Sequence, residues 1–250
     1  MAAATSTSLS TNDTRILHAL FDPETLPSSV ARAKDASSID PSLPPHPIIP
    51  SNQIATLETQ QNELVHNVSP TSSTSVIESV IEEQDAVIAR HPNYPSAYVN
   101  RAMLRRMSLE VGLADDKTIF SALTSNSAVE ALFTDLARAI HLSLPSSSPS
   151  SPVSPYRARV LRTAYSHRAY LYLKAAESEV RLQGKDKSEL EELASGDFAA
   201  AARYGDEVAR EMSVRTNPYA KMCGAIVRNA LMDERKGEES QKGEEERKIE

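Results

Sequence analysis

The chain has 250 residues and a formal net charge of −7, and aromatic residues make up only 5% of it. That length allows one domain of ordinary size with tails, or two small domains. Only seven glycines are present and the first is Gly112, so the glycine-rich loops that cradle phosphates in nucleotide enzymes are not expected. The acidic charge argues against nucleic-acid binding, because neutralising phosphates needs a basic face.

The cysteine count and the hydropathy bear on where the protein works. Cys223 is the sole cysteine, so no internal disulfide is possible, and a reducing compartment, most simply the cytoplasm, is expected. Arg15 is the first basic residue, so the basic start of a secretory signal is missing. No apolar run approaches the ~18 residues that a membrane span requires, and no membrane contact is expected.

Residues 1–52 are predicted to be a largely disordered N-terminal region. Seven prolines fall within residues 22–50, which predicts a linker, because proline removes a backbone donor and helical freedom. A short helix is expected near residues 13–21, closed by Asp22 and Pro23. Its apolar stripe is expected to dock back onto the protein's own groove or hairpin edge, and it consists of Ile16, Leu17, Leu20 and Phe21.

Residues 53–235 are predicted to form an all-α domain. Apolar residues recur there at helical spacing, in stretches separated by short connections, which is typical of antiparallel helical hairpins. Serine and proline dominate residues 143–155, which predicts a flexible loop without packed structure. The charged tail, residues 236–250, is expected to be solvated.

The chain contains an internal repeat. The segment from Tyr98 to Leu104 recurs as Tyr165 to Leu171, with tyrosine, arginine, alanine and leucine in register. The offset of 67 residues matches one 34-residue tetratricopeptide unit plus inserts at residues 108–126 and 143–155. We therefore expect a short solenoid of three helical hairpins, at residues about 53–92, 95–142 and 156–204, followed by a cap at 206–234.

Side chains of the size that such hairpins need occupy the packing positions. Tetratricopeptide hairpins pair a large residue with a small one in the first helix, and small, bulky and small residues in the second. The first unit is degenerate, because Gln61 and Gln84 stand at two of its packing positions. The residues assigned to repeat packing are Tyr98, Ala102, Tyr165, Ala169, Ala194, Phe198 and Ala201.

A C-terminal run adds a resemblance. Ala202-Arg203-Tyr204-Gly205 is followed by Asn217-Pro218-Tyr219-Ala220, and near the N-terminus stands Leu17-His18-Ala19-Leu20-Phe21-Asp22-Pro23. This order resembles the tetratricopeptide repeat protein 36 family over residues 14–26 and 53–235. Asn217 and Pro218 are a sound helix start, and Tyr219, Met222, Ile226, Val227 and Leu231 are expected to cover the third hairpin as a cap. The resemblance implies a partnership with the seventy-kilodalton heat-shock chaperone and a link to tyrosine metabolism through protected enzyme partners.

The concave face of stacked hairpins is the expected place for a protein or peptide partner. Chaperone-binding members of the superfamily grip a C-terminal carboxylate there with lysine, asparagine and arginine side chains. The corresponding places in this chain are Glu58, Asn62, Asn100, Thr163 and His167. Both lysines are missing and Glu58 would repel a carboxylate, so the standard clamp is not expected.

A basic cluster offers another mode of contact. Arg101 and Arg105 could face the groove beside Arg168 and pair with acidic peptide groups. The alternative is that these arginines are solvated or pair with local acids such as Asp135, and both interpretations stay open. The remaining arginines of the cluster are Arg106, Arg157, Arg159 and Arg162.

No catalytic or cofactor constellation is visible. The six histidines never fall at metal-ligand spacing, and Cys223 is expected to be a small core residue rather than a nucleophile. No cofactor is expected. The sequence thus favours a non-enzymatic adaptor, co-chaperone-like, that binds a protein partner through Asn62, Asn100, Arg101, Arg105, His167 and Arg168. The alternative is a structural subunit of a larger assembly that uses apolar edges.

Overall fold

A computed structural model describes residues 38–69, 71–113, 117–120, 126–146, 148 and 151–246. For Asn126 and residues 233–246 it describes the backbone alone. Within these ranges the chain forms helices and two isolated β-bridges, which confirms the all-α class. The helices, in chain order, are α3 (Ser51–His66), α4 (Thr74–Arg90), α5 (Pro95–Glu110), α6 (Asn126–Ser143), α7 (Pro155–Glu177), α8 (Lys187–Arg203), α9 (Glu207–Arg215) and α10 (Pro218–Glu246).

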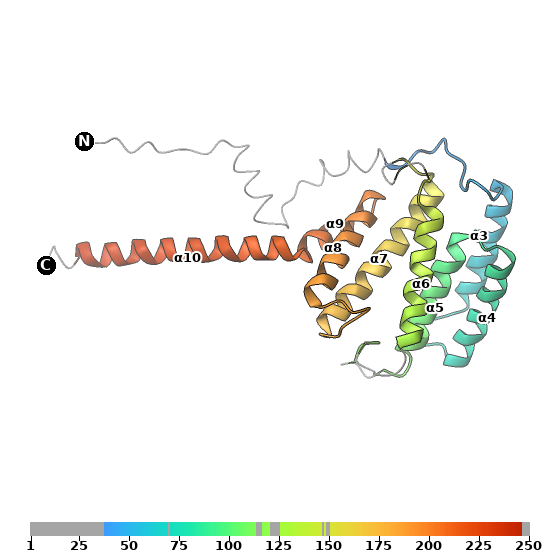
Figure 1. Ribbon diagram of the computed structural model, residues 1–250, viewed down its shortest axis with the longest axis horizontal. Coiled ribbons are helices and arrows are strands. Elements are labelled where there is room, and N and C mark those ends of the chain that lie inside the picture. Colours follow the sequence, from blue (N-terminus) through green and yellow to red (C-terminus); the bar gives the residue numbers. More distant parts are fainter. Residues whose placement is uncertain are drawn as a thin grey trace.

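The helices α4 to α9 lie side by side in chain order (Figure 1). Each helix packs mainly against the next one along the chain, so the arrangement is solenoid-like. The three helices α3, α5 and α7 also contact one another in sequence across one face. We call this face the groove face, because it is formed by the first helix of each expected hairpin.

Local sequence signals set the helix starts. Pro155 begins α7 after Ser154, whose hydroxyl accepts a hydrogen bond from the Arg157 amide. Asp186 and Glu189 form a capping box at α8. The Asn217 side chain accepts a bond from the Tyr219 amide at 2.9 Å, so the predicted start of α10 is correct.

The two self-similar segments have matching surroundings. Ala102 and Ala169 are both essentially fully buried, which lets the neighbouring helices approach closely. Tyr98 and Tyr165 each carry the guanidinium of an arginine over the ring, 5.6 Å from the centroid in both cases. Phe198, Ala194 and Ala201 are buried against Ala169 in one cluster, as their assignment to repeat packing requires.

The first hairpin differs from the other two. Helix α4 packs closely on α5, while its contact with α3 is sparse. Gln61 and Gln84 are both buried, at 3% and 0% exposure, where a repeat would place apolar side chains. Amide side chains cannot replace the dispersion contacts of a large apolar residue at such positions, which agrees with a degenerate first unit.

The linker and loop predictions are wrong for the parts that the structure describes. Ile39 and Val153 form a parallel bridge, with the Val153 amide donating to the Ser38 carbonyl at 3.0 Å and the Asp40 amide to the Val153 carbonyl at 2.9 Å. Val153 is fully buried, and Ile49 packs against α3 and α5. Proline-rich and serine-rich segments pack here because two of them, distant in sequence, satisfy each other's backbone groups. The short helix expected near residues 13–21 lies outside the described residues.

The C-terminal cap is α9 rather than α10. Helix α9 packs along α8 and buries Ala209, whereas α10 leaves the stack and projects away from it (Figure 1). Tyr219, Met222 and Ile226 are 63%, 54% and 61% exposed, and Cys223 is also exposed. The expectation that these residues cover the third hairpin, with Cys223 in the core, is therefore wrong. Helical spacing predicts an apolar stripe but not its direction.

Candidate functional site on the groove face

The groove face carries a cavity of about 120 Å³ between α3, α5 and α7. Seven of its ten lining residues are polar or charged, and these can form hydrogen bonds with a peptide. The structure brings together four of the five places that correspond to the chaperone clamp, and the fifth, His167, is not in the lining. The four are Glu58, Asn62, Asn100 and Thr163.

Glu58 joins the three helices of this face. Its carboxylate accepts hydrogen bonds from the Tyr94 hydroxyl at 2.6 Å and the Ser96 hydroxyl at 2.7 Å, both at the start of α5. It also pairs with the Arg159 guanidinium of α7. A charge that is paired and hydrogen-bonded in this way is satisfied within the protein. Glu58 therefore holds the groove together instead of presenting a free carboxylate.

Burial tunes the two tyrosines of this network. Burial raises the pKa of Tyr94, and its hydrogen bond to the Glu58 carboxylate raises that pKa further. Burial likewise raises the pKa of Tyr156, whose hydroxyl lies 3.0 Å from that of Ser96. Both phenols therefore keep their protons across the physiological range, and Tyr94 acts as a donor to Glu58.

The amides on the other side of the cavity are partly engaged. The Asn100 amide nitrogen donates to the side-chain oxygen of Gln61 at 2.8 Å, so the buried glutamine of α3 orients the asparagine of α5. The Thr163 hydroxyl donates to the Arg159 carbonyl at 3.0 Å. Asn62 stands exposed at the rim. The arrangement offers amide and hydroxyl groups to a peptide backbone, without a lysine to neutralise a terminal carboxylate.

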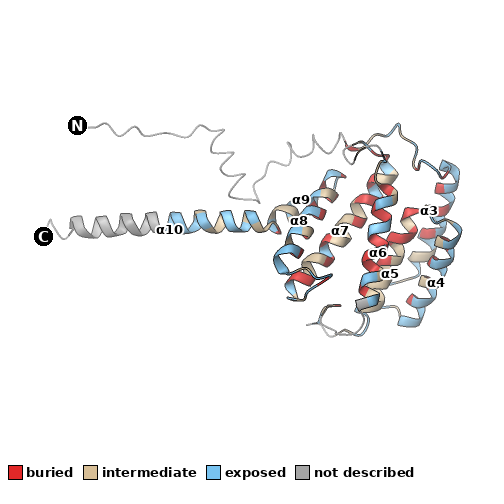
Figure 2. Cartoon of the chain, in the orientation of Figure 1, coloured by how far each residue is buried: buried red, intermediate tan, exposed pale blue. Residues whose placement is uncertain are grey.

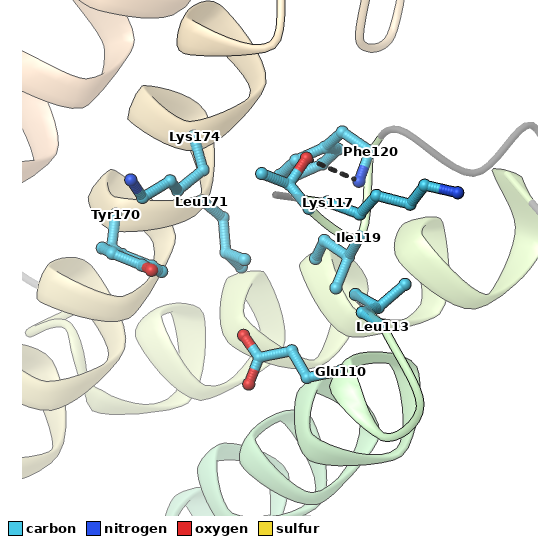
Figure 3. Close-up of a pocket in the computed structure, with 9 residues that line it drawn as sticks. Glu110, Leu113, Lys117, Ile119, Phe120, Tyr170, Leu171 and Lys174 are labelled. Atoms are coloured by element: carbon cyan, nitrogen blue, oxygen red, sulfur yellow. Dashed lines mark hydrogen bonds between the residues drawn. The ribbon is translucent and has the colours of Figure 1, made fainter. Parts of the chain in front are cut away.

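A second cavity, of about 360 Å³, lies between the end of α5, the second half of α7, Leu113 and residues 117–120 (Figure 3). Glu110 of α5 and Tyr170 of α7 direct their polar ends toward it, whereas the Lys117 amine points away. Residues of the predicted 108–126 insert close one side, including Ile119, which is buried in the main core. The Thr118 hydroxyl lies 2.9 Å from that of Ser178, which fixes the insert to the end of α7.

His167 and Arg106 lie on α7 and α5 and are close enough to interact electrostatically. Burial and, to a smaller extent, the Arg106 charge lower the pKa of His167 to about 4. The imidazole is therefore neutral at physiological pH. It cannot replace a clamp cation there.

The arginines assigned to the groove point elsewhere. Arg101 donates from Nε to Asp135 at 2.9 Å and from a terminal nitrogen to Asp85 at 2.6 Å. Arg105 pairs with the same Asp135 at 2.9 Å, and Arg168 pairs with Asp197 at 2.6 and 2.8 Å. The contacts with Asp135 and Asp197 link the first helix of a hairpin to its second helix, and the contact with Asp85 links α5 to α4 of the preceding hairpin. None of these three arginines is in the cavity lining. The geometry therefore matches the alternative interpretation, local ion pairs.

Sequence reasoning missed Ser96 and Tyr94 as members of the site, and it named Arg159 only as part of the basic cluster. A usable signal was present, because Ser96 precedes Asn100 by four residues and Arg159 precedes Thr163 by four. Residues four apart lie on one face of a helix. Extending each clamp position by one turn toward the helix start would have placed both residues on the groove face.

Two searches of the described residues bear on other kinds of site. No group of three or more histidine, cysteine, aspartate or glutamate side chains in these ranges could hold a metal ion. Among the same residues, no helix is long and apolar enough to cross a membrane.

Sequence similarity to known proteins shows the family of the chain. The chain is 41% identical over 250 residues to the L-tyrosine degradation gene cluster protein hmgX of Aspergillus fumigatus, an alignment that covers 92% of this chain and 94% of hmgX. The chain belongs to the hmgX family. More distantly, it is 24% identical to tetratricopeptide repeat protein 36 of Bos taurus, over 88% of this chain and 93% of that protein. The human protein of the same name is 28% identical over 62% of this chain and 60% of its own length. No protein-family model and no solved structure matches the chain.

Proposed function

We propose that this protein is a non-enzymatic adaptor of the tetratricopeptide type that holds a protein partner on its groove face. The observation that carries the proposal is the convergence of Asn62, Asn100 and Thr163, from three different helices, on one polar cavity. Alternate helices that direct polar side chains into a shared groove are the usual means by which helical repeats bind peptides. The distant similarity to tetratricopeptide repeat protein 36 supports the repeat assignment.

The name of one relative supports a partner class. Because hmgX is named for L-tyrosine degradation, we propose that the partner is an enzyme of that process and that the chain supports it without catalysing a step. We propose the cytoplasm as the compartment, because a chain with a single free cysteine and no internal disulfide suits a reducing environment.

The chaperone partner implied by the resemblance would need a contact other than the carboxylate clamp. Glu58 stands in the first clamp position with its carboxylate bound to Arg159, and His167 is neutral at the last. A C-terminal aspartate would therefore find amides and hydroxyls but no free cation. We expect a peptide that ends in aspartate to bind no more tightly than its C-terminally amidated form.

A second candidate function is a structural subunit of a larger assembly. It is favoured by α10, whose exposed apolar residues would suit contact with another protein. This function needs the apolar edge of the protein rather than the groove face, so variants of the two surfaces separate the candidates.

The experiment measures binding of the purified chain to each purified enzyme of tyrosine degradation by calorimetry. The groove variant carries Asn62→Arg and Thr163→Arg, which crowd the cavity. The control carries Gln60→Arg and Thr134→Arg, which add the same side chains at exposed sites outside the cavity lining. We expect the groove variant to lose at least tenfold in affinity and the control to lose none. Equal affinity of both variants would overturn the proposal that the groove face is the binding site. Binding to none of the enzymes would overturn the proposed partner class.

A further inference from the structure

Helix α10 presents an unpartnered apolar stripe. Tyr219, Met222, Cys223 and Ile226 follow one another at spacings of three, one and three residues, so they share one side of the helix. All four are exposed, and Figure 2 shows this part of α10 as mainly exposed beyond its first residues. Lys221, on the opposite side, pairs with Glu191 of α8 at 3.0 Å. The stripe therefore faces away from the stack.

We propose that residues 13–21 of the same chain, here called the N-terminal segment, dock as a short helix on the α10 stripe. Their sequence carries four large apolar residues on one helical face, Ile16, Leu17, Leu20 and Phe21. Two short apolar stripes that are each too small to be stable alone gain by covering each other. This inference goes beyond the proposed function and does not depend on it.

The connecting chain is long enough. Ser38 is held at Val153, immediately before α7. Arg157 of α7 is close enough to Tyr204, at the end of α8, to affect its pKa, and from there α9 leads to α10 over a helix of about 14 Å. Residues 22–37 can extend over about 50 Å. The N-terminal segment therefore reaches the whole stripe.

The groove face suits this segment less well than the α10 stripe does. The cavity on the groove face is lined by Glu58, Asn62, Asn100 and other polar groups. Leucine and phenylalanine side chains placed there would cover the exposed amide of Asn62 without offering it a hydrogen-bond partner, which costs free energy, whereas Glu58 and Asn100 already have partners within the protein. The α10 stripe is mainly apolar, and its polar groups are the Tyr219 hydroxyl and the Cys223 thiol.

A second copy of the chain is a weaker occupant. The stripe from Tyr219 to Ile226 covers only about two helical turns, whereas a stable dimer buries roughly 1,000 Å² or more. The N-terminal segment needs less area, because a flexible tether gives it an effective concentration in the millimolar range. A contact too weak to hold two molecules together is thus sufficient within one molecule.

Cys223 reports on this contact, because it is the sole cysteine and lies within the stripe. The experiment follows the rate at which its thiol in the full chain reacts with a chromogenic aromatic disulfide. A contact with a dissociation constant of the order of the effective concentration or tenfold below it slows the reaction by about twofold to tenfold. The test variant carries Leu17→Ser and Leu20→Ser, which remove the apolar face of the segment without changing its charge. The control carries Ala19→Ser, on the other face of the same expected helix.

The expected result is a slow reaction in the natural chain and in the Ala19→Ser control, and a reaction about twofold to tenfold faster in the Leu17→Ser, Leu20→Ser variant. Light scattering should give a monomer throughout, and the rates should not depend on protein concentration. Equal rates in all three proteins would overturn the proposal. Equally fast rates would mean that the stripe stays uncovered, and equally slow rates would mean that the helical stack itself covers it. A rate that falls as protein concentration rises, together with a doubled mass, would assign the stripe to a second copy and also overturn it.

Discussion

Arg101 and Arg168 stand 67 residues apart and make the same two contacts. Each lies over the ring of the tyrosine three residues before it, and each binds with two nitrogens an aspartate of the following helix, Asp135 or Asp197. The repeat detected in the sequence is thus a repeat of an ion pair as well as of helix packing. Each bidentate pair fixes the angle between the two helices of a hairpin, because the planar guanidinium accepts a carboxylate in one orientation.

Replacing Asp135 should destabilise the fold strongly. Its side chain is 3% exposed and binds both Arg101 and Arg105, so Asp135→Ala removes the buried partner of two guanidinium groups, of which Arg101 keeps its second partner Asp85. Breaking a buried pair by removing one member typically costs 3–5 kcal/mol. We expect a loss of about that size in the free energy of unfolding, measured by urea denaturation.

The control is Glu110→Ala, which removes the exposed partner of Arg106 and should cost less than about 1 kcal/mol. A further variant, Asp135→Ala with Arg105→Met, should recover part of the loss, because it removes a guanidinium whose ion pair with Asp135 is gone. Equal losses in the free energy of unfolding for Asp135→Ala and Glu110→Ala would show that the buried ion pairs of Asp135 do not stabilise the fold more than an exposed pair does.

The helices could be predicted from the sequence because their signals are local. Apolar spacing, Pro95, Pro155 and Pro218 at first helical positions, and a capping asparagine are all read within a few residues. The end of α7 at Glu177 has no comparable local signal. Glu179 and Gln183 adopt φ values of 55° and 53° there, and neither residue type signals such a turn.

Long-range pairings were beyond the reach of the sequence. Nothing in a run of serine and proline indicates that Val153 meets Ile39, because the match depends on two segments far apart in the chain. The ion pairs of the arginines were equally unpredictable. The position of an arginine on a helix does not determine whether its guanidinium faces the groove or binds Asp135. The clamp positions on the groove face were predictable, because repeat register alone places Asn62, Asn100 and Thr163 together.

Glu58 should matter for stability more than a surface carboxylate does. The Glu58→Gln substitution keeps a side chain of similar size but removes the charge that Tyr94, Ser96 and Arg159 share. Hydrogen bonds to charged groups contribute about 1.5–3 kcal/mol each, and weaker neutral bonds replace them in the variant. We expect a net loss of about 1–3 kcal/mol in the free energy of unfolding.

The matched control for this variant is Glu63→Gln, five residues along α3 at an exposed position. It should change the free energy of unfolding by less than about 0.5 kcal/mol. If both substitutions had the same small effect, Glu58 would be a solvated side chain and would not tie the three helices together.

His167 should make stability depend on pH. Its pKa falls from 6.5 to about 4 in the folded chain, because burial and the Arg106 charge disfavour the imidazolium. The unfolded chain therefore binds a proton first as the pH falls. The stabilising contribution is complete above pH 6.5 and is lost progressively down to pH 4, by up to about 3 kcal/mol.

The measurement compares urea unfolding of the natural chain and of His167→Gln between pH 7 and pH 5. The variant should lose less stability than the natural chain over this interval, by about 1–2 kcal/mol. His141→Gln, at an exposed site on α6, serves as the control and should follow the natural chain. Parallel curves for all three proteins would place the His167 titration outside the folding equilibrium.

Ile49 should anchor the proline-rich segment to the stack. Its side chain is 9% exposed and packs with Leu57 of α3 and Ala97 of α5, whereas its neighbour Ile48 is 69% exposed. Truncating a buried isoleucine to alanine removes apolar burial and leaves a cavity, at a cost of about 2–5 kcal/mol. Ile49→Ala should therefore lower the urea midpoint clearly, while Ile48→Ala removes the same atoms from an exposed site and should leave it nearly unchanged. Because the two residues are adjacent and chemically identical, a difference between them reports burial alone, and equal midpoints would mean that the segment before α3 is a free linker after all.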